Sequence, residues 1–219
     1  MHITVQNLID IQKKINSCLD NIKINKLPKV IAVSKTFSID KINPLIEHGH
    51  LDFGENKVQE AIDKWSNIKL KNKNINLHLI GSLQTNKVKF AVKLFDFIHS
   101  VDSEKLAKKI YDEQEKQTKK IKIFIQVNIG NEEQKSGIKK SLLPNLYSYC
   151  KKLDLDVIGL MCIPPQDKSA DYYFKELNNL NKKLGLNELS MGMSADFIDA
   201  VKCSATYLRI GSTIFGKRS

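Results

Sequence analysis

Lys35 is the first residue whose type and position could do chemistry. It follows the apolar run at 30–34 and stands between Ser34 and Thr36 in the stretch AVSKT. A lysine held among apolar groups has its charged form disfavoured, so its amine becomes a better nucleophile and can form a Schiff base with an aldehyde. The same residue can also end a strand and extend its ammonium group into solvent. From AVSKT alone, this second interpretation is favoured.

Phosphate binding is a second candidate chemistry, indicated by the C-terminal segment. Ser194, in SMGMSADF, stands where the N-cap of a helix over 195–203 is expected, and a capped helix N-terminus can hold a phosphate. Gly211 and Ser212 follow the apolar run at 207–210 in RIGST. Glycine lets the backbone approach a ligand closely, and the serine adds a donor. The alternative is an ordinary cap followed by an ordinary turn.

Strand-like and helical runs alternate along the chain after an opening amphipathic helix over 6–22. The predicted strands lie near residues 30–34, 51–53, 77–80, 97–101, 121–129, 157–162, 189–191 and 207–210. The predicted helices lie at 40–48, 56–65, 84–95, 104–117, 142–153, 170–184 and 195–203. No hairpin-type dipeptide joins two strands, so the sheet is expected to be parallel. Pro44 fits badly inside its helix, which is expected to begin late or to bend there.

A closed (β/α)8 TIM barrel with an extra N-terminal helix is the economical arrangement of these elements. A doubly wound open sheet is the alternative, and it requires the second and seventh predicted strands to be wrong. The 219 residues, 42% of them hydrophobic, are enough for a substantial core. No low-complexity linker, repeat or shift of composition divides the chain, so residues 1–219 are expected to form a single domain.

Barrel geometry gives the polar strand residues a meaning, because active sites of this fold lie at the carboxyl ends of the strands. Lys35 stands at such an end. Loops after the seventh and eighth strands are the usual phosphate site, and they carry Ser194 and Gly211. Alternation places Phe124, Gln126 and Asn128 on one face of IKIFIQVN, and Tyr207, Arg209 and Gly211 on one face of TYLRIGS. A lumen that is apolar below and polar at its top fits both strands.

The composition limits the partners and the compartment. The net charge of +11 comes from lysines spread along almost every segment rather than clustered, so nucleic-acid binding is not expected. The cysteines Cys18, Cys150, Cys162 and Cys203 are isolated, which predicts reduced thiols and no metal site. No targeting segment and no run as long as a membrane span is present in the sequence, so we expect a soluble, cytoplasmic protein.

Seven blocks of the sequence resemble one family. AVSKT, FGENKVQE, HLIGSLQTNK, KSGI, GLMCIP, MGMSADF and RIGSTIFG occur in the order found in the pyridoxal phosphate homeostasis proteins, the YggS/PROSC family. The resemblance extends over residues 31–216. It implies a barrel similar to the N-terminal domain of alanine racemase, a pyridoxal phosphate (PLP) fold of type III, with PLP bound covalently.

The resemblance also implies roles for individual residues. Lys35 corresponds to the Schiff-base lysine and Arg209 to the residue facing the pyridine nitrogen. The phosphate contacts correspond to Ser194, Gly211 and Ser212, and two further pocket-lining positions to Asn56 and Met161. Two positions depart from the family. Lys57 stands where the family often has an aromatic residue, and Ser204 stands near a position where it often has a glycine.

The chemistry of Arg209 then favours a carrier over an enzyme. Arginine only donates hydrogen bonds, so it would keep the pyridine nitrogen unprotonated and weaken the electron sink on which PLP enzymes depend. Alanine racemase works with an arginine there, but it has a second domain and a tyrosine base from a partner subunit, for which this chain has no room. We therefore expect no catalytic residue, and a monomer that stores PLP or delivers it to apo-enzymes.

Several alternatives stay open at this point. The first is a weak PLP-dependent racemase or lyase, and the second is a Schiff-base aldolase or phosphate-binding barrel without PLP. Lys135, in QKSGI, follows a strand end and could act as a second amine at the barrel mouth. The alternative for Lys135 is a solvated loop lysine.

Overall fold

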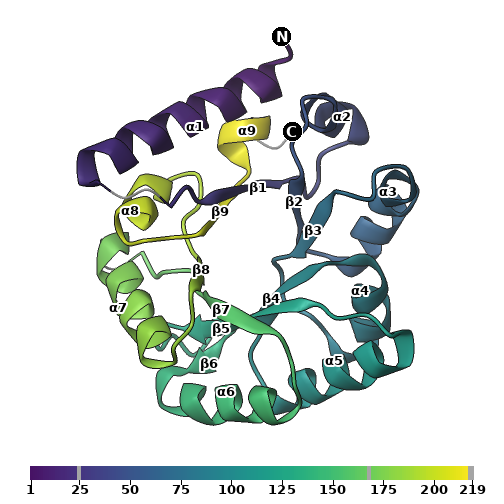
Figure 1. The fold of residues 1–219 in the computed structure, drawn as a ribbon, viewed down its shortest axis with the longest axis vertical. Helices are drawn as coiled ribbons and strands as arrows, with labels where there is room; N and C mark the ends of the chain where they lie inside the picture. Colours follow the sequence, from purple (N-terminus) through teal and green to yellow (C-terminus); the bar gives the residue numbers. More distant parts are fainter. Residues whose placement is uncertain (24–25, 167–168, 217–219) are drawn as a thin grey trace.

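The structure, a computed structural model, describes residues 1–23, 26–166 and 169–216 as a closed parallel barrel surrounded by helices (Figure 1). The eight barrel strands follow one another in the order β4-β3-β2-β1-β9-β8-β7-β5, and pairing of β4 with β5 closes the ring. Their bounds are β1 Lys29–Val33, β2 Asp52–Glu55, β3 Asn76–Leu79, β4 Phe97–Val101, β5 Lys122–Asn128, β7 Val157–Met161, β8 Glu188–Ser190 and β9 Tyr207–Ile210.

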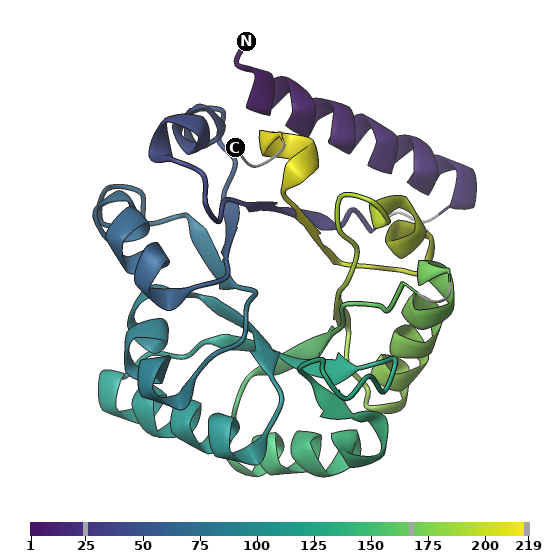
Figure 2. The same ribbon diagram turned by 180° about the vertical axis from the view of Figure 1, so that it is seen from behind.

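Helices cover the outside of the barrel, as the opposite view also shows (Figure 2). They are α1 Ile3–Ile22, α2 Ile39–Glu47, α3 Val58–Lys71, α4 Val88–Leu94, α5 Glu104–Gln117, α6 Leu143–Lys152, α7 Ala170–Lys183, α8 Phe197–Lys202 and α9 Ser212–Phe215. Short 3-10 turns, η1 Thr85–Lys87 and η2 Lys140–Leu142, lead into α4 and α6. A further strand, β6 Ile138–Lys139, pairs with the end of β5 outside the ring.

The predicted TIM barrel with an extra N-terminal helix is confirmed. The second and seventh predicted strands, on which the choice between barrel and open sheet depended, are β2 and β8. The structure corrects some boundaries. The helix predicted over 56–65 begins only at Val58, and α2 begins at Ile39 and continues through Pro44, so its expected late start is wrong. Neither β6 nor α9 is predicted from the sequence, because both are too short to show a period.

The outer shell, the space between the strands and the helices, is apolar. Its largest fully buried side chains include Phe53, Trp65 and Phe174. Helix α1 buries an apolar stripe against this shell and lies against α2, α8 and α9. Asn7 of α1 donates from its Nδ2 to the carbonyl oxygen of Ile214 in α9 at 2.9 Å. The first helix is therefore tied to the last one (Figure 1).

The lumen holds a second, smaller cluster. Its apolar members are Ile31, Val33, Phe97, Phe124, Met161 and Tyr207. The predicted lumen faces of β5 and β9 are confirmed by Phe124 and Tyr207, whose rings meet edge to face at 5.2 Å between centroids. Gly54 of β2 leaves space for this cluster, because a Cβ there would lie 2.8 Å from Cγ2 of Ile31. Buried polar residues share the lumen, and they are described below.

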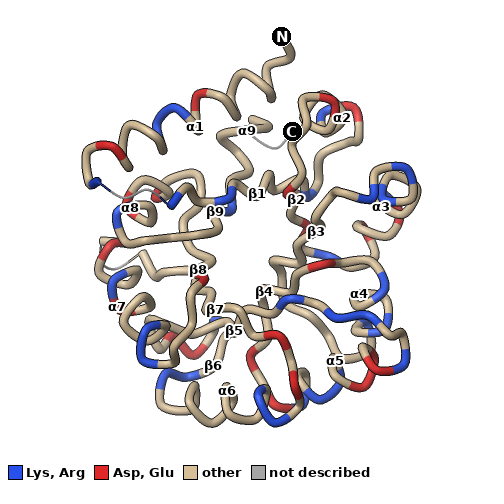
Figure 3. The backbone as a smooth tube through the Cα atoms, viewed as in Figure 1, with Lys and Arg blue, Asp and Glu red and all other residues tan. Residues whose placement is uncertain are grey.

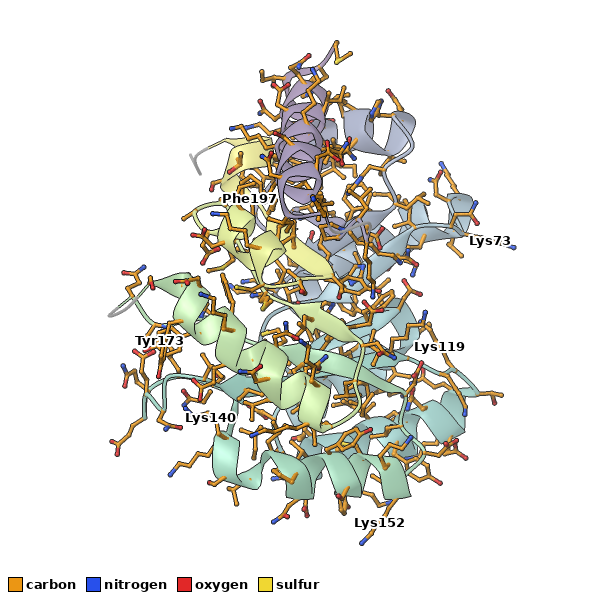
Figure 4. All side chains as sticks on the ribbon, turned by 60° about the vertical axis from the view of Figure 1, so that its left-hand side comes forward. Lys73, Lys119, Lys140, Lys152, Tyr173 and Phe197 are labelled. Atoms are coloured by element: carbon orange, nitrogen blue, oxygen red, sulfur yellow. The ribbon has the colours of Figure 1, made fainter. Side chains whose placement is uncertain are left out.

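Lysine and arginine are distributed around the whole barrel rather than gathered on one face (Figure 3). Lys73 and Lys152, for example, point away from the molecule on different sides (Figure 4). This distribution agrees with the even spread of lysine in the sequence. Among the described residues, no helix has the length and apolar character needed to cross a membrane.

Candidate functional site

A cavity of about 440 Å³ lies at the carboxyl ends of the strands and is the candidate site. Six of the seven residues predicted for a cofactor site line it: Lys35, Asn56, Ser194, Arg209, Gly211 and Ser212. Met161 does not line this cavity, and lies fully buried in the lumen cluster. Met161 therefore packs inside the lumen and does not face the open cavity. The volume falls in the range of about 300–1,000 Å³ that is usual for small-molecule sites.

Lys35 is positioned from its N-terminal side by a buried carboxylate. Oε1 of Glu55, on β2, accepts hydrogen bonds from Ser34 Oγ at 2.7 Å, Lys64 Nζ at 3.0 Å and Trp65 Nε1 at 3.0 Å. The Lys64 ammonium also donates to the carbonyl oxygen of Ser34 at 2.9 Å. The last residue before Lys35 is thus held against β2 and against helix α3.

The chain on the other side of Lys35 is held by the same helix. Thr36 has a φ of 66°, a left-handed conformation that a β-branched residue rarely adopts. Its amide donates to Oε1 of Glu60 at 2.6 Å, and Lys64 lies 3.3 Å from that oxygen. Burial acts to raise the pKa of Glu60, but the Thr36 amide and the Lys64 charge together bring it below its ordinary value. Helix α3 therefore holds the strained turn that ends β1 and directs the backbone at Lys35.

The two loops predicted to bind phosphate meet at one end of the cavity. The amide of Thr213 donates to Oγ of Ser194 at 3.3 Å, which joins the loop after β8 to helix α9. Gly211 and Ser212 stand at the start of that helix. The prediction that Ser194 is the N-cap of the following helix is wrong. Asp196 is the N-cap of α8, and its Oδ1 accepts from the amide of Met193 at 2.6 Å.

Arg209 forms the floor of the cavity. Its side chain is buried, and it donates from one terminal nitrogen to Ser190 Oγ at 2.7 Å and from the other to the carbonyl oxygen of Cys162 at 2.8 Å. Burial lowers the pKa of Arg209. No carboxylate of the described residues forms an ion pair with this guanidinium, so the buried charge is balanced by dipoles near it.

Asn56 lies in the cavity wall and has an unsatisfied polar atom. Its side-chain oxygen is buried and has no hydrogen-bond partner among the described residues. The backbone of Asn56 is packed against the end of β3, where a Cβ on Gly81 would lie 2.2 Å from its carbonyl oxygen. Only glycine fits at residue 81, and this close approach fixes the position of Asn56. A buried acceptor without a donor indicates a place for a ligand group or a water.

The cavity contains few groups that could exchange protons. Among its described lining residues, only Lys35 and Arg209 are titratable. Of the tyrosines, Tyr207 lies in the lumen, where burial raises its pKa. No cluster of metal-ligating side chains occurs within the part of the chain that the structure describes.

Lys135 lies beside a second hollow of about 290 Å³, which shares Ile80, Gly81 and Ile163 with the first. Its ammonium pairs with Oε2 of Glu132 at 2.6 Å. A role for Lys135 as a second amine stays a prediction.

Other lining residues were not proposed from the sequence, among them Phe37, Ile80, Gly81, Ile163 and Met193. The alternation in LHLI places Ile80 on the same face as His78, so this residue had a usable signal. The others lie in connections whose course has no period.

The fold and the cavity together define a class: a TIM barrel with a lysine at the end of its first strand, an arginine on its last, and polar groups in the final two loops. Comparisons with known proteins agree. The alanine racemase N-terminal domain family matches residues 10–219. A pyridoxal phosphate homeostasis protein of Pasteurella multocida is 35% identical over 225 residues, covering 97% of each chain. The chain belongs to the pyridoxal phosphate homeostasis protein family, whose barrel is that of the alanine racemase N-terminal domain.

Solved structures of PipY from Synechococcus elongatus show the same barrel. The structure without PLP superposes with a TM-score of 0.88 at 31% identity, covering 98% of this chain and 100% of PipY. The structure with PLP bound gives 0.81 at 32% identity, covering 92% and 100%. PipY is thus a relative of this chain that binds PLP.

Proposed function

We propose that this protein binds PLP on Lys35 and buffers or delivers the cofactor. The observation that carries the proposal is the single cavity that Lys35, Arg209 and Ser212 line. PLP has three groups to recognise, an aldehyde, a pyridine nitrogen and a phosphate. The cavity offers an amine, a guanidinium and a set of serine hydroxyls and backbone amides. The bound PLP of PipY and the names of the curated relatives support the same conclusion.

Lys35 would hold the aldehyde covalently. Its amine adds to the carbonyl carbon, a C=N bond forms, and the carbonyl oxygen leaves as water, so the link reverses by hydrolysis. The turn at Thr36 and the contacts of Lys64 would keep the backbone of Lys35 in place while this happens. Covalent and reversible attachment is what storage and release of an aldehyde require.

The remaining residues would orient the cofactor. Arg209 would donate to the pyridine nitrogen, and Ser194, Gly211 and Ser212 would bind the phosphate. Asn56 would use its unpartnered oxygen on a donor of the ligand, while Met161 would pack from below within the lumen. Bound PLP supplies an electrophilic carbon and an electron sink, and a donor-only arginine at the ring nitrogen keeps that sink weak.

A carrier role is favoured over catalysis by the scarcity of proton-exchanging groups around the cavity. A racemase that uses two bases needs an acid or base besides the lysine, and the described lining offers only Arg209 in addition to Lys35. We propose a cytoplasmic, monomeric carrier, organised as one domain, that supplies PLP to apo-enzymes.

Borohydride reduction of the PLP-incubated protein, followed by peptide mass spectrometry, tests the site. We expect a phosphopyridoxyl adduct on the Lys35 peptide and its loss in Lys35→Ala. Lys57→Ala is the matched control, because Lys57 is exposed at the start of α3 and lies nearby in the sequence. Label scattered over surface lysines, or no adduct, would contradict the proposal.

Turnover separates the carrier from the racemase or lyase. Incubation of the PLP-loaded protein with a panel of amino acids should leave them unchanged, while an apo-enzyme added to the same protein should gain PLP. Turnover that disappears in Lys35→Ala would instead establish the enzyme.

A further inference from the structure

Five side chains form a continuous hydrogen-bonded chain through the barrel lumen. Arg209 donates to Ser190 Oγ at 2.7 Å, and Ser190 Oγ lies 2.8 Å from Nδ1 of His99. Nε2 of His99 lies 3.0 Å from Nδ1 of His78, and Nε2 of His78 lies 3.0 Å from Oδ1 of Asp52. The chain begins at the floor of the cavity and ends at the first residue of β2. We call these side chains the lumen relay.

The relay crosses the barrel rather than following one wall. His99 on β4 and Ser190 on β8 belong to strands that are far apart in the order of the sheet, yet their side chains meet. His78, His99 and Ser190 have no exposed surface at all. Aromatic rings flank both imidazoles: Phe97 stacks on His78 with centroids 4.2 Å apart, and Phe124 stacks on His99 at 4.4 Å. Neither ring of the pair can turn without displacing a neighbour.

The direction of every hydrogen bond follows from the two ends. A guanidinium only donates and a carboxylate only accepts, while a hydroxyl or a neutral imidazole does one of each. If Arg209 donates to Ser190, the serine hydroxyl can donate to Nδ1 of His99. His99 then donates from Nε2 to His78, and His78 donates from Nε2 to Asp52. The links and the protons match one to one, so the relay is satisfied with both imidazoles neutral and protonated on Nε2.

Electrostatics favour this arrangement of charges. Burial lowers the pKa of His78, and burial, followed by the nearby His78 and Arg209, lowers that of His99 further, so both shifts favour the neutral rings. Burial acts to raise the pKa of Asp52, but His78, Lys29 and Asn76 together bring it below its ordinary value. The hydrogen bonds between Arg209 and Asp52 therefore all point the same way. Aligned bonds of this kind polarise one another in a medium of low dielectric.

We propose that Ser190, His99, His78 and Asp52 are positioning residues that orient the Arg209 guanidinium and so set how Arg209 donates to the pyridine nitrogen of PLP. This inference rests on the proposed function for its consequence, but the relay itself can be measured without PLP. Ser190 and the Cys162 carbonyl use one N–H on each terminal nitrogen, which leaves three N–H groups of Arg209 for a ligand. The relay acts on the cofactor only through Arg209.

Histidine tautomers in the unliganded protein give the first test. Nitrogen-15 NMR of histidine-labelled protein at pH 7 should show His78 and His99 neutral with the proton on Nε2, assigned by the signals lost in His78→Gln and His99→Gln. A proton on Nδ1 of either ring, or a doubly protonated ring, would overturn the relay. The tautomers are measured in the wild-type protein, and the two variants serve only to assign its signals.

The absorbance of the PLP-loaded protein gives the second test. In His99→Leu, which does not touch Arg209, and in Ser190→Ala, we expect the cofactor band to shift and PLP release to accelerate at least tenfold. Ser190→Thr keeps the hydroxyl and should stay within about twofold of the wild type. The matched control is Phe124→Leu, which alters packing on His99 but removes no hydrogen bond.

The outcomes separate this inference from the proposed function. If wild-type protein shows no cofactor band on addition of PLP, the proposed function fails, while the tautomer measurement still decides the relay. If the band forms and only Ser190→Ala alters it, the effect is a local contact with Arg209 and the relay is overturned. If Phe124→Leu shifts the band as much as His99→Leu does, packing rather than the relay is responsible, and the inference is again overturned.

Discussion

The outer shell and the lumen use opposite faces of the same strands, yet they are built differently. The shell is filled by apolar side chains such as Phe53, Trp65 and Phe174. The lumen mixes apolar rings with imidazoles and a guanidinium. Buried polar groups are costly unless they are hydrogen-bonded, and here they bond to one another. The apolar shell stabilises the barrel, while the polar lumen groups form the hydrogen-bonded chain that ends at Arg209 in the cavity.

The largest expected effect comes from opening a hole in the shell. Phe174→Ala on α7 removes a fully buried ring, and such substitutions cost about 3–5 kcal/mol of unfolding free energy. PLP binding per folded molecule should not change, because Phe174 is remote from the lumen cluster. Urea unfolding together with borohydride labelling measures both quantities. Leu70→Ala on the exposed side of α3 is the control, with an expected change within about 0.5 kcal/mol.

The second largest effect is expected on lowering the pH, which should reduce the free energy of unfolding through the buried histidines of the lumen. The pKa of His78 and of His99 in the folded protein lies below the ordinary 6.5, so the unfolded chain binds more protons as the pH falls below that value. The contribution of the two neutral rings to the free energy of unfolding is fully present above pH 6.5. Below that pH it declines by up to about 1.4 kcal/mol per pH unit for each ring. Urea unfolding from pH 8 to pH 5 measures it. A stability that is the same at pH 7.5 and pH 5.5 would show that the rings are not buried as neutral groups.

The smallest effect lies outside both regions, at Ser204. This residue has a φ of 68° directly after α8, where its amide donates to the Val201 carbonyl oxygen at 3.0 Å and the Ala205 amide donates to that of Ala200 at 2.9 Å. That pattern is a helix ending that favours glycine. Ser204→Gly should raise the unfolding free energy by about 0.5–1 kcal/mol. Ser204→Ala, which keeps a Cβ, should give no gain, and an equal gain in both variants would exclude relief of backbone strain.

The sequence predicts best where a period of two operates. Lys35 was expected at a strand end and Arg209 on the lumen face of the last strand, and both line the cavity. A strand has only two faces, so one known direction fixes all the others along it. Met161 was predicted from the family resemblance alone, and it lies buried in the lumen cluster instead of lining the cavity.

Prediction failed where two residues compete for one local role. Ser194 alone was predicted as the N-cap, yet Asp196, two residues further on, is an equally good N-cap type. In the structure Asp196 takes the cap, and Ser194 accepts instead from Thr213, nineteen residues further along the chain. Only the folded protein brings that donor close, so no local rule could have made the choice.

The relay was missed for a related reason. His78 lies two residues before Ile80, and His99 lies two residues after Phe97. Alternation along each strand therefore places both histidines on the lumen face. Their meeting with each other and with Ser190 depends on the stagger of the strands around the ring. Single histidines on inward faces are usually satisfied core residues, and nothing in the order of residues relates β4 to β8.

The pairing of β1 with both β2 and β9 has a consequence for protein synthesis. Lys35 leaves the ribosome well before Arg209, so the two proposed cofactor contacts are separated by most of the time in which the barrel strands are made. Until β9 arrives, β1 has a free edge and α1 lacks its contact with Ile214. The cavity that Lys35 and Arg209 line is therefore complete only after β9 has been made. PLP loading at the proposed site would therefore distinguish a closed barrel from a nascent chain that has not yet closed.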